Sequence, residues 1–113
     1  MIPAVVHVGP FAWEVVLEDL PSCYGETRLE SLTIALRPGM PPQLARETFA
    51  HELLHACHLT AGIDDGRFTA ERIVAAISPF FVDMLDRNPA VVAFLLAPDA
   101  IQSGEAERGG RHG

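Results

Sequence analysis

The chain has 113 residues, 49% of them hydrophobic, and a formal net charge of −7. This length and composition favour one ordered domain with a modest core, and the acidic charge argues against a surface that binds nucleic-acid phosphates. No apolar run reaches the roughly 18 residues of a membrane-spanning helix and no secretory signal is visible, so we expect a cytoplasmic protein without membrane contact. We expect the domain to cover residues 1–101 and residues 102–113 to form a disordered tail.

The first third of the chain predicts a short sheet. Val5–Val8 and Ala12–Leu17 are rich in apolar and β-branched residues, and Gly9-Pro10 between them indicates a hairpin-like pair. The segment 21–25 is typical of a turn. Arg28–Leu36 then alternates again, with Leu32, Ile34 and Leu36 on one side. These patterns favour an antiparallel-type sheet in the N-terminal part of the chain.

Proline and glycine residues at 37–42 end this last strand, and a helical pattern follows from Pro41 to about Thr60. Its apolar residues recur at helical spacing and should form one stripe that faces the core. This predicted stripe consists of Phe49, Ala50, Leu53, Leu54 and Cys57. We interpret Cys57 as a small core residue and Cys23 as a turn residue, with both thiols reduced.

A His-Glu-x-x-His pattern occupies residues 51–55 of this predicted helix. His51 and His55 are one turn apart, so both project from one face and can direct ring nitrogens at one zinc ion. Glu52 points to the side of that pair, where it can act on a water as a general base. The alternative is a solvated helix with two surface histidines. We favour the metal site because the pair lies beside the apolar stripe, where a cleft is expected.

A catalytic zinc site needs a third protein ligand, and Glu71 is the best candidate. It follows the loop at 62–66 near the start of the next helical pattern, so antiparallel helices would bring it beside the two histidines. Its alternative role is that of a first-turn carboxylate that complements the helix dipole. Asp64 and Asp65 are reserve ligands that also suit a turn. His58 is too far along the helix to share the ion with the first histidine.

Two further helices are predicted after the loop. In the first, Ser78-Pro79 should introduce a kink or an end, and Asn88-Pro89 should start the second. The second, at 90–96, is apolar on nearly all sides; we favour a core helix over the alternative of a dimer contact. The apolar stripe of the first consists of Phe68, Val74, Ile77, Phe81 and Leu85.

The run His51-Glu52-Leu53-Leu54-His55 followed by Glu71 resembles the zincin-type metallopeptidases of the ImmA/IrrE group, particularly small stand-alone versions carried by phages and prophages. The resemblance covers roughly residues 28–85. It implies an α+β class, minimal zincin-like fold: a short sheet, the active-site helix, and two or three further helices. In the family, a strand before the metal helix borders the cleft and can pair with an extended substrate.

The resemblance also implies zinc as the cofactor, with His51, His55 and Glu71 as ligands and Glu52 as general base. The expected function is hydrolysis of peptide bonds in a peptide or protein substrate, in the host cytoplasm if the chain is phage-encoded. In larger members the ligand glutamate opens an acidic, asparagine-containing stretch, which residues 71–75 lack. One alternative is a catalytically silent zinc-containing phage accessory protein that acts as a protein-binding module. The other is a structural protein without metal.

Overall fold

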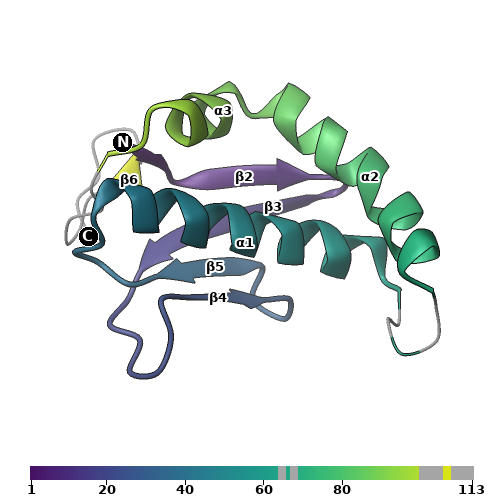
Figure 1. The fold of residues 1–113 in the computed structure, drawn as a ribbon, viewed down its shortest axis with the longest axis horizontal. Helices are drawn as coiled ribbons and strands as arrows, with labels where there is room; N and C mark the ends of the chain where they lie inside the picture. The colour runs from purple at the N-terminus through teal and green to yellow at the C-terminus, as the bar shows by residue number, and fades with distance from the viewer. Residues whose placement is uncertain (64–65, 67–68, 100–105, 108–113) are drawn as a thin grey trace.

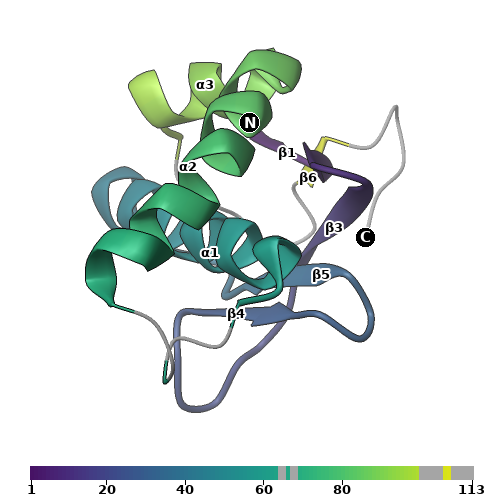
Figure 2. The same cartoon turned by 90° about the vertical axis from the view of Figure 1, so that its right-hand side faces the viewer.

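The computed structural model describes residues 1–63, 66, 69–99 and 106–107, which form an α+β fold with a mixed sheet and three helices. The helices lie on one face of the sheet, and the core fills the space between the two layers (Figures 1 and 2). In chain order the elements are β1 (Ile2–Pro3), β2 (Val5–Val8), β3 (Phe11–Leu17), β4 (Gly25–Arg28), β5 (Thr33–Leu36), α1 (Pro42–Ala61), α2 (Ala70–Arg87), α3 (Pro89–Leu96) and β6 (Ala106–Glu107).

The larger sheet has the strand order β2-β3-β5-β4. β2 and β3 form the predicted antiparallel hairpin, in which Val6 lies opposite Trp13. β4 is antiparallel to β5, but β5 is parallel to β3, so the prediction of a wholly antiparallel-type sheet is wrong at that pairing. The reason is the path of the chain: after β3 it crosses to the far edge, runs back as β4, and only then enters between the two as β5.

The strand predicted at 28–36 is two strands with a tight turn between them. β4 ends at Arg28 and β5 begins at Thr33. In the turn, the N–H of Leu32 donates to the carbonyl of Leu29 at 3.1 Å, and Leu32 has a φ of 50°. A left-handed backbone conformation is unfavourable for a residue other than glycine, so a leucine gives no sequence signal for a turn at position 32. The apolar alternation of the segment therefore predicted one continuous strand. The edge strand therefore lies earlier in the chain than predicted, over residues 25–28.

Helix α1 confirms the predicted helix, and three members of the predicted stripe, Phe49, Leu53 and Cys57, are buried, but the buried face is shifted from the predicted one. Leu54, placed on the predicted stripe, is 46% exposed, whereas Glu52 is only 6% exposed. The buried face is rotated toward this carboxylate because the edge strand β4 packs against α1 and supplies a donor for it. The buried residues of α1 are Ala45, Phe49, Glu52, Leu53, Ala56 and Cys57.

Helix α2 continues through Pro79, so the predicted end at this residue is wrong. Just before the proline, the Ser78 hydroxyl donates to the carbonyl of Val74 at 2.6 Å. The predicted stripe holds only in part. Val74 is 56% exposed, Met84 is fully buried, and Phe68 lies outside the described residues. The stripe members that pack against the core are Ile77, Phe81 and Leu85.

Asn88 joins α2 to α3 at the break that its Asn-Pro pair predicts. Its Nδ2 donates to the carbonyls of His7 and Met84 at 2.8 and 2.6 Å, and its Oδ1 accepts from the N–H of His7 at 2.9 Å. The buried amide thus holds the α2–α3 junction against β2. In α3, Phe94 packs edge-to-face on Phe49 with ring centroids 5.6 Å apart. Val91 and Phe94 of α3 are buried in the core, whereas Leu96 is 78% exposed, so one face of this helix contributes to the core.

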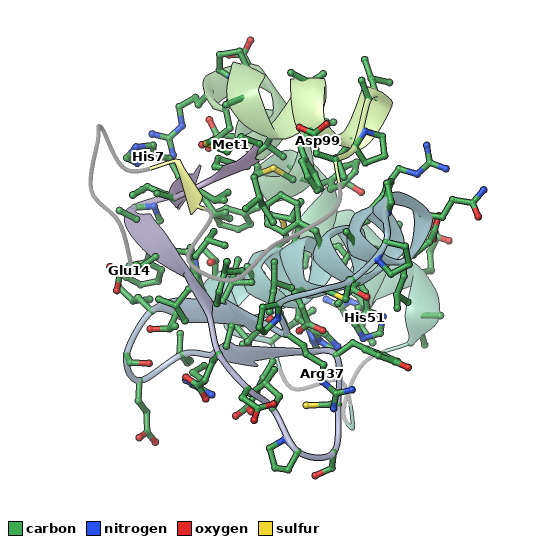
Figure 3. All side chains as sticks on the ribbon, turned by 90° about the vertical axis from the view of Figure 1, so that its left-hand side faces the viewer. Met1, His7, Glu14, Arg37, His51 and Asp99 are labelled. Atoms are coloured by element: carbon green, nitrogen blue, oxygen red, sulfur yellow. The ribbon has the colours of Figure 1, made fainter. Side chains whose placement is uncertain are left out.

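The two ends of the described chain meet beside α3. β1 and β6 form a short parallel pair, and the Met1 ammonium contacts Asp99 at 2.6 Å (Figure 3). Of the predicted disordered tail, only residues 106–107 are described, and there the chain is paired with β1. No helix within the described ranges has the length and apolar character that crossing a membrane requires. Cys57 is buried and reduced, and burial raises the pKa of its thiol to about 11.

Candidate functional site

His51 and His55 project from successive turns of α1, and both side chains are exposed. Figure 3 shows His51 on this helix. Their Nε2 atoms are 3.0 Å apart and their ring centroids 4.7 Å apart. One proton shared between the two nitrogens accounts for this separation. So does a common orientation toward one small cation, because two ligands at Zn–N distances of about 2.0–2.1 Å lie roughly 3.3 Å from each other.

Glu52 turns away from solvent, into the junction between α1 and β4. Its Oε1 accepts a hydrogen bond from the Thr27 hydroxyl at 2.7 Å, and the same hydroxyl lies 3.2 Å from the Glu52 carbonyl. Burying a carboxylate is costly unless a donor compensates for the lost water, and Thr27 supplies one. The carboxylate is therefore held by the edge strand, whereas the imidazoles face outward.

Gly25, at the start of β4, also lies close against Glu52. A Cβ at Gly25 would lie 2.9 Å from the Cγ of Glu52, 2.9 Å from the Cγ2 of Thr48 and 3.0 Å from the Oε2 of Glu52. Separations of this size are repulsive for carbon atoms, which meet favourably at about 3.5–4.0 Å. The edge strand can thus approach α1 at this point only because residue 25 has no side chain.

A cleft of about 330 Å³ opens between the start of β4 and the first half of α1. Its volume is at the lower end of the range for ligand sites, about 300–1,000 Å³. Both His51 and Glu52 line it, so one of the two histidines and the glutamate of the motif border the same space. The other lining residues are Cys23, Tyr24, Gly25, Glu47 and Thr48.

Tyr24 is held at the rim of this cleft by Arg37. The guanidinium carbon lies 4.9 Å from the centre of the Tyr24 ring, and the guanidinium Nε donates to the carbonyl of Leu20 at 3.1 Å. The backbone N–H of Arg37 also donates to the Tyr24 carbonyl at 2.8 Å. A cation over the face of an aromatic ring is attractive, so Arg37 restrains the position of the Tyr24 ring.

A second hollow, of about 600 Å³, lies at the other end of β4 and extends to Leu59 in the last turns of α1. Thr27 lines this hollow and also contacts Glu52. The two spaces therefore follow the same edge strand, with the buried carboxylate between them. The remaining lining residues are Arg28, Leu29, Glu30 and Ser31.

The charges on the opposite face of β4 are paired with one another. Arg28 contacts Glu18 at 2.7 Å and Glu26 at 3.2 Å. The hydrogen bond from Arg28 holds the pKa of Glu18 below its usual value, and the two carboxylates raise the pKa of Arg28. Because this guanidinium is engaged with its own carboxylates, it does not offset the charge of Glu52.

The third predicted ligand, Glu71, is exposed in the first turn of α2. Among the residues that the structure describes, no three His, Cys, Asp or Glu side chains stand together in a way that could hold a metal ion. The structure thus brings His51 and His55 together without Glu71. The reserve ligands Asp64 and Asp65 lie outside the described residues. His58 does not line the cleft; its Nε2 is buried and has no hydrogen-bond partner among the described atoms.

Thr27 and Gly25 are site residues that the sequence analysis missed. They belong to the polar segment Gly-Glu-Thr-Arg, which has neither an apolar period nor a known motif. The one available signal was Glu52 itself. A glutamate on the inner side of an amphipathic helix needs a donor, and a hydroxyl on a neighbouring strand is a common source.

Imidazole nitrogens are among the ligands that zinc prefers, so the histidine pair could supply two of the three protein ligands of a catalytic site. Comparisons of the chain with protein-family models, with curated proteins and with solved structures find no match in any of the three.

Proposed function

We propose that this protein is a zinc-dependent metallopeptidase with a zincin-like fold. The observation that carries the proposal is the arrangement of the His-Glu-x-x-His residues. Two Nε2 atoms lie 3.0 Å apart on the outer face of α1, and the intervening glutamate is buried beside a cleft that one of these histidines also lines. A solvated helix with incidental surface histidines does not require a buried carboxylate between them.

His51 and His55 would hold the metal, and Glu71 remains the predicted third ligand from α2. A bound zinc ion supplies a Lewis acid, which polarises a carbonyl group and makes a coordinated water more acidic. Glu71 is the second residue of α2, which begins at Ala70.

Glu52 acts as the general base. Its carboxylate accepts a proton from the attacking water and then donates it to the nitrogen of the leaving amine, which restores the carboxylate for the next cycle. Its near-complete burial keeps bulk water from competing for these proton transfers. The proposal requires this residue to be unnecessary for metal binding and necessary for hydrolysis.

The free edge of β4 suits an extended peptide as substrate. The N–H of Arg37 donates to the carbonyl of Tyr24, so these two residues form a hydrogen-bonded pair of the antiparallel β4–β5 ladder. Hydrogen-bonded and non-hydrogen-bonded pairs alternate along such a ladder, and the backbone groups of Gly25 and Thr27 therefore point away from β5. Such groups at a sheet edge can pair with an added strand. The two hollows along β4 would then receive substrate side chains on either side of Glu52.

The test is Glu52→Gln in the full-length chain. We expect the variant to retain near-stoichiometric zinc and to lose hydrolysis by about 100-fold or more, because general acid–base catalysis contributes about 10²–10⁴. Zinc is measured by elemental analysis, and hydrolysis by mass spectrometry of a diverse peptide mixture. Glu47→Gln, at an exposed position of the same cleft, is the matched control and should leave hydrolysis largely intact. Wild-type rates in E52Q, or a wild type that binds no divalent metal, would contradict the proposal.

A second function is favoured by one observation: within the described residues no third ligand accompanies the histidine pair. This is a catalytically silent zinc protein that acts by docking on another protein. In that case Glu52→Gln would bind its partner as the wild type does, and the wild type loaded with zinc would cleave no peptide.

A further inference from the structure

The hydrogen bond between Thr27 and Glu52 joins the edge strand to the proposed base. At 2.7 Å the contact from the Thr27 hydroxyl to Oε1 has the common length of an O–H···O bond, whereas the contact to the Glu52 carbonyl is 3.2 Å. A hydroxyl has one proton, so the shorter contact identifies the carboxylate as its acceptor. This bond links residues that are 25 positions apart in the chain.

The same bond removes a freedom that the glutamate would otherwise have. A glutamate side chain has three rotatable bonds, and one that extends from a helix toward a strand can adopt several rotamers. Thr27 holds Oε1 from one side. Gly25 lies so close on the other side that even a Cβ there would come within 3.0 Å of Oε2. The two β4 residues therefore determine which oxygen is engaged and which one remains beside the cleft.

We infer that Thr27 is a positioning residue for Glu52. It engages Oε1 and so leaves Oε2, at the Gly25 side of the cleft, as the oxygen that transfers protons. The inference rests on the proposed function, because the carboxylate that Thr27 orients is the proposed base. It adds that β4 has two roles, since the strand that presents its free edge to a peptide also sets the orientation of the group that acts on it.

Two substitutions separate the hydroxyl from the bulk of the side chain. Thr27→Val has nearly the same shape without the hydroxyl, and Thr27→Ser keeps the hydroxyl without the methyl group. Thr33→Val is the matched control, because Thr33 is a threonine of the neighbouring strand β5 whose hydroxyl donates to the Ser31 carbonyl at 3.2 Å, and Thr33 does not line the cleft. Each variant is examined as the full-length chain loaded with zinc.

We expect T27V to lower kcat by about 10- to 100-fold with little change in KM, since a misaligned base loses part of the general-base contribution. T27S should recover kcat to within about threefold of the wild type, and T33V should resemble the wild type. All variants should bind zinc equally. A loss in T27S as large as in T27V, or an increase in KM in place of the decrease in kcat, would overturn the inference.

A second readout does not depend on activity. In protein with ¹³C-labelled glutamate, the side-chain couplings of Glu52 should report one rotamer in the wild type, T27S and T33V, and an average of rotamers in T27V. If T27V does not fold, Thr27→Ala carries the same expectation. A single unchanged rotamer without the hydroxyl overturns the inference. A zinc-loaded wild type that cleaves nothing refutes the proposed function instead, and the rotamer measurement still decides the role of Thr27.

Discussion

At the level of single residues, the position of the Glu52 side chain depends on the glycine at position 25. The carboxylate of Glu52 occupies a place on α1 where an apolar residue is expected, and it is compensated by the hydroxyl of Thr27. The space it needs exists only because residue 25 lacks a side chain. Gly25 is not in a left-handed conformation, so its role here is close approach of backbone to side chain, not a special φ.

Gly25→Ala should therefore be destabilising. We expect a loss of about 1–3 kcal/mol in the free energy of unfolding, the usual cost of added bulk in a packed region, measured by urea denaturation. Because part of the overlap is with the Cγ of Glu52, the same substitution in a Glu52→Ala background should cost less. An unchanged stability of G25A would contradict this account, and an equal cost in both backgrounds would assign the overlap to Thr48.

At the level of elements, the end of α2 holds the β2–β3 hairpin in place. Its Asp83 carboxylate accepts from the N–H of Gly9 at 3.3 Å, and Arg87 donates to the Gly9 carbonyl at 2.6 Å. One residue later, Asn88 bonds both backbone groups of His7. These contacts join segments about 80 positions apart in the chain and hold the end of α2 against the β2–β3 hairpin.

Asn88→Ala should lower the free energy of unfolding by about 2–4 kcal/mol, because it removes the amide's hydrogen bonds to the part-buried backbone groups of His7 and to the buried carbonyl of Met84. Urea denaturation followed by circular dichroism provides the measurement. Asp99→Asn is the control: the Asp99 contact with the Met1 ammonium is exposed, and such pairs contribute about 0–1 kcal/mol. A stability of N88A equal to or above that of D99N would show that the hydrogen bonds of the Asn88 amide do not hold the α2–α3 junction in place.

For the whole molecule, the proposed site joins three parts of the chain. α1 provides the histidine pair and the base, β4 provides the hydroxyl and the free edge, and α2 is predicted to provide the third ligand. The net charge of −7 favours the approach of a cation to any part of this surface. Substitution of the proposed ligands should therefore distinguish specific binding of zinc at the histidine pair from this general attraction of cations to the acidic surface.

Zinc should raise the thermal stability of the wild type by about 2.7 kcal/mol at a free concentration of 100 times Kd, and this gain should be absent from His51→Ala and His55→Ala. Glu71→Gln should reduce the gain, whereas Glu47→Gln should not. Differential scanning calorimetry with and without zinc measures these changes. An equal gain in the two glutamine variants would exclude Glu71 as a ligand, and the corresponding test would then move to Asp64 and Asp65.

Several elements could be predicted because their signals are local. The spacing of apolar residues over a few turns predicted α1, the Asn88-Pro89 pair predicted the break before α3, and Gly9-Pro10 predicted the β2–β3 hairpin. Of the two outcomes predicted at Pro79, a kink or an end, the end is wrong for a tertiary reason: packing of Ile77 and Phe81 against the core outweighs one missing backbone donor.

The sequence alone determined that two histidines share one face of a helix with a glutamate beside them, because helical geometry depends only on residues within one or two turns. Only the tertiary structure decided that Glu52 is buried, that Thr27 and Gly25 surround it, and that β5 enters the sheet parallel to β3. These features arise from contacts between atoms far apart in the chain. The residue that gives β4 access to α1 is a glycine, and what matters there is the side chain it lacks.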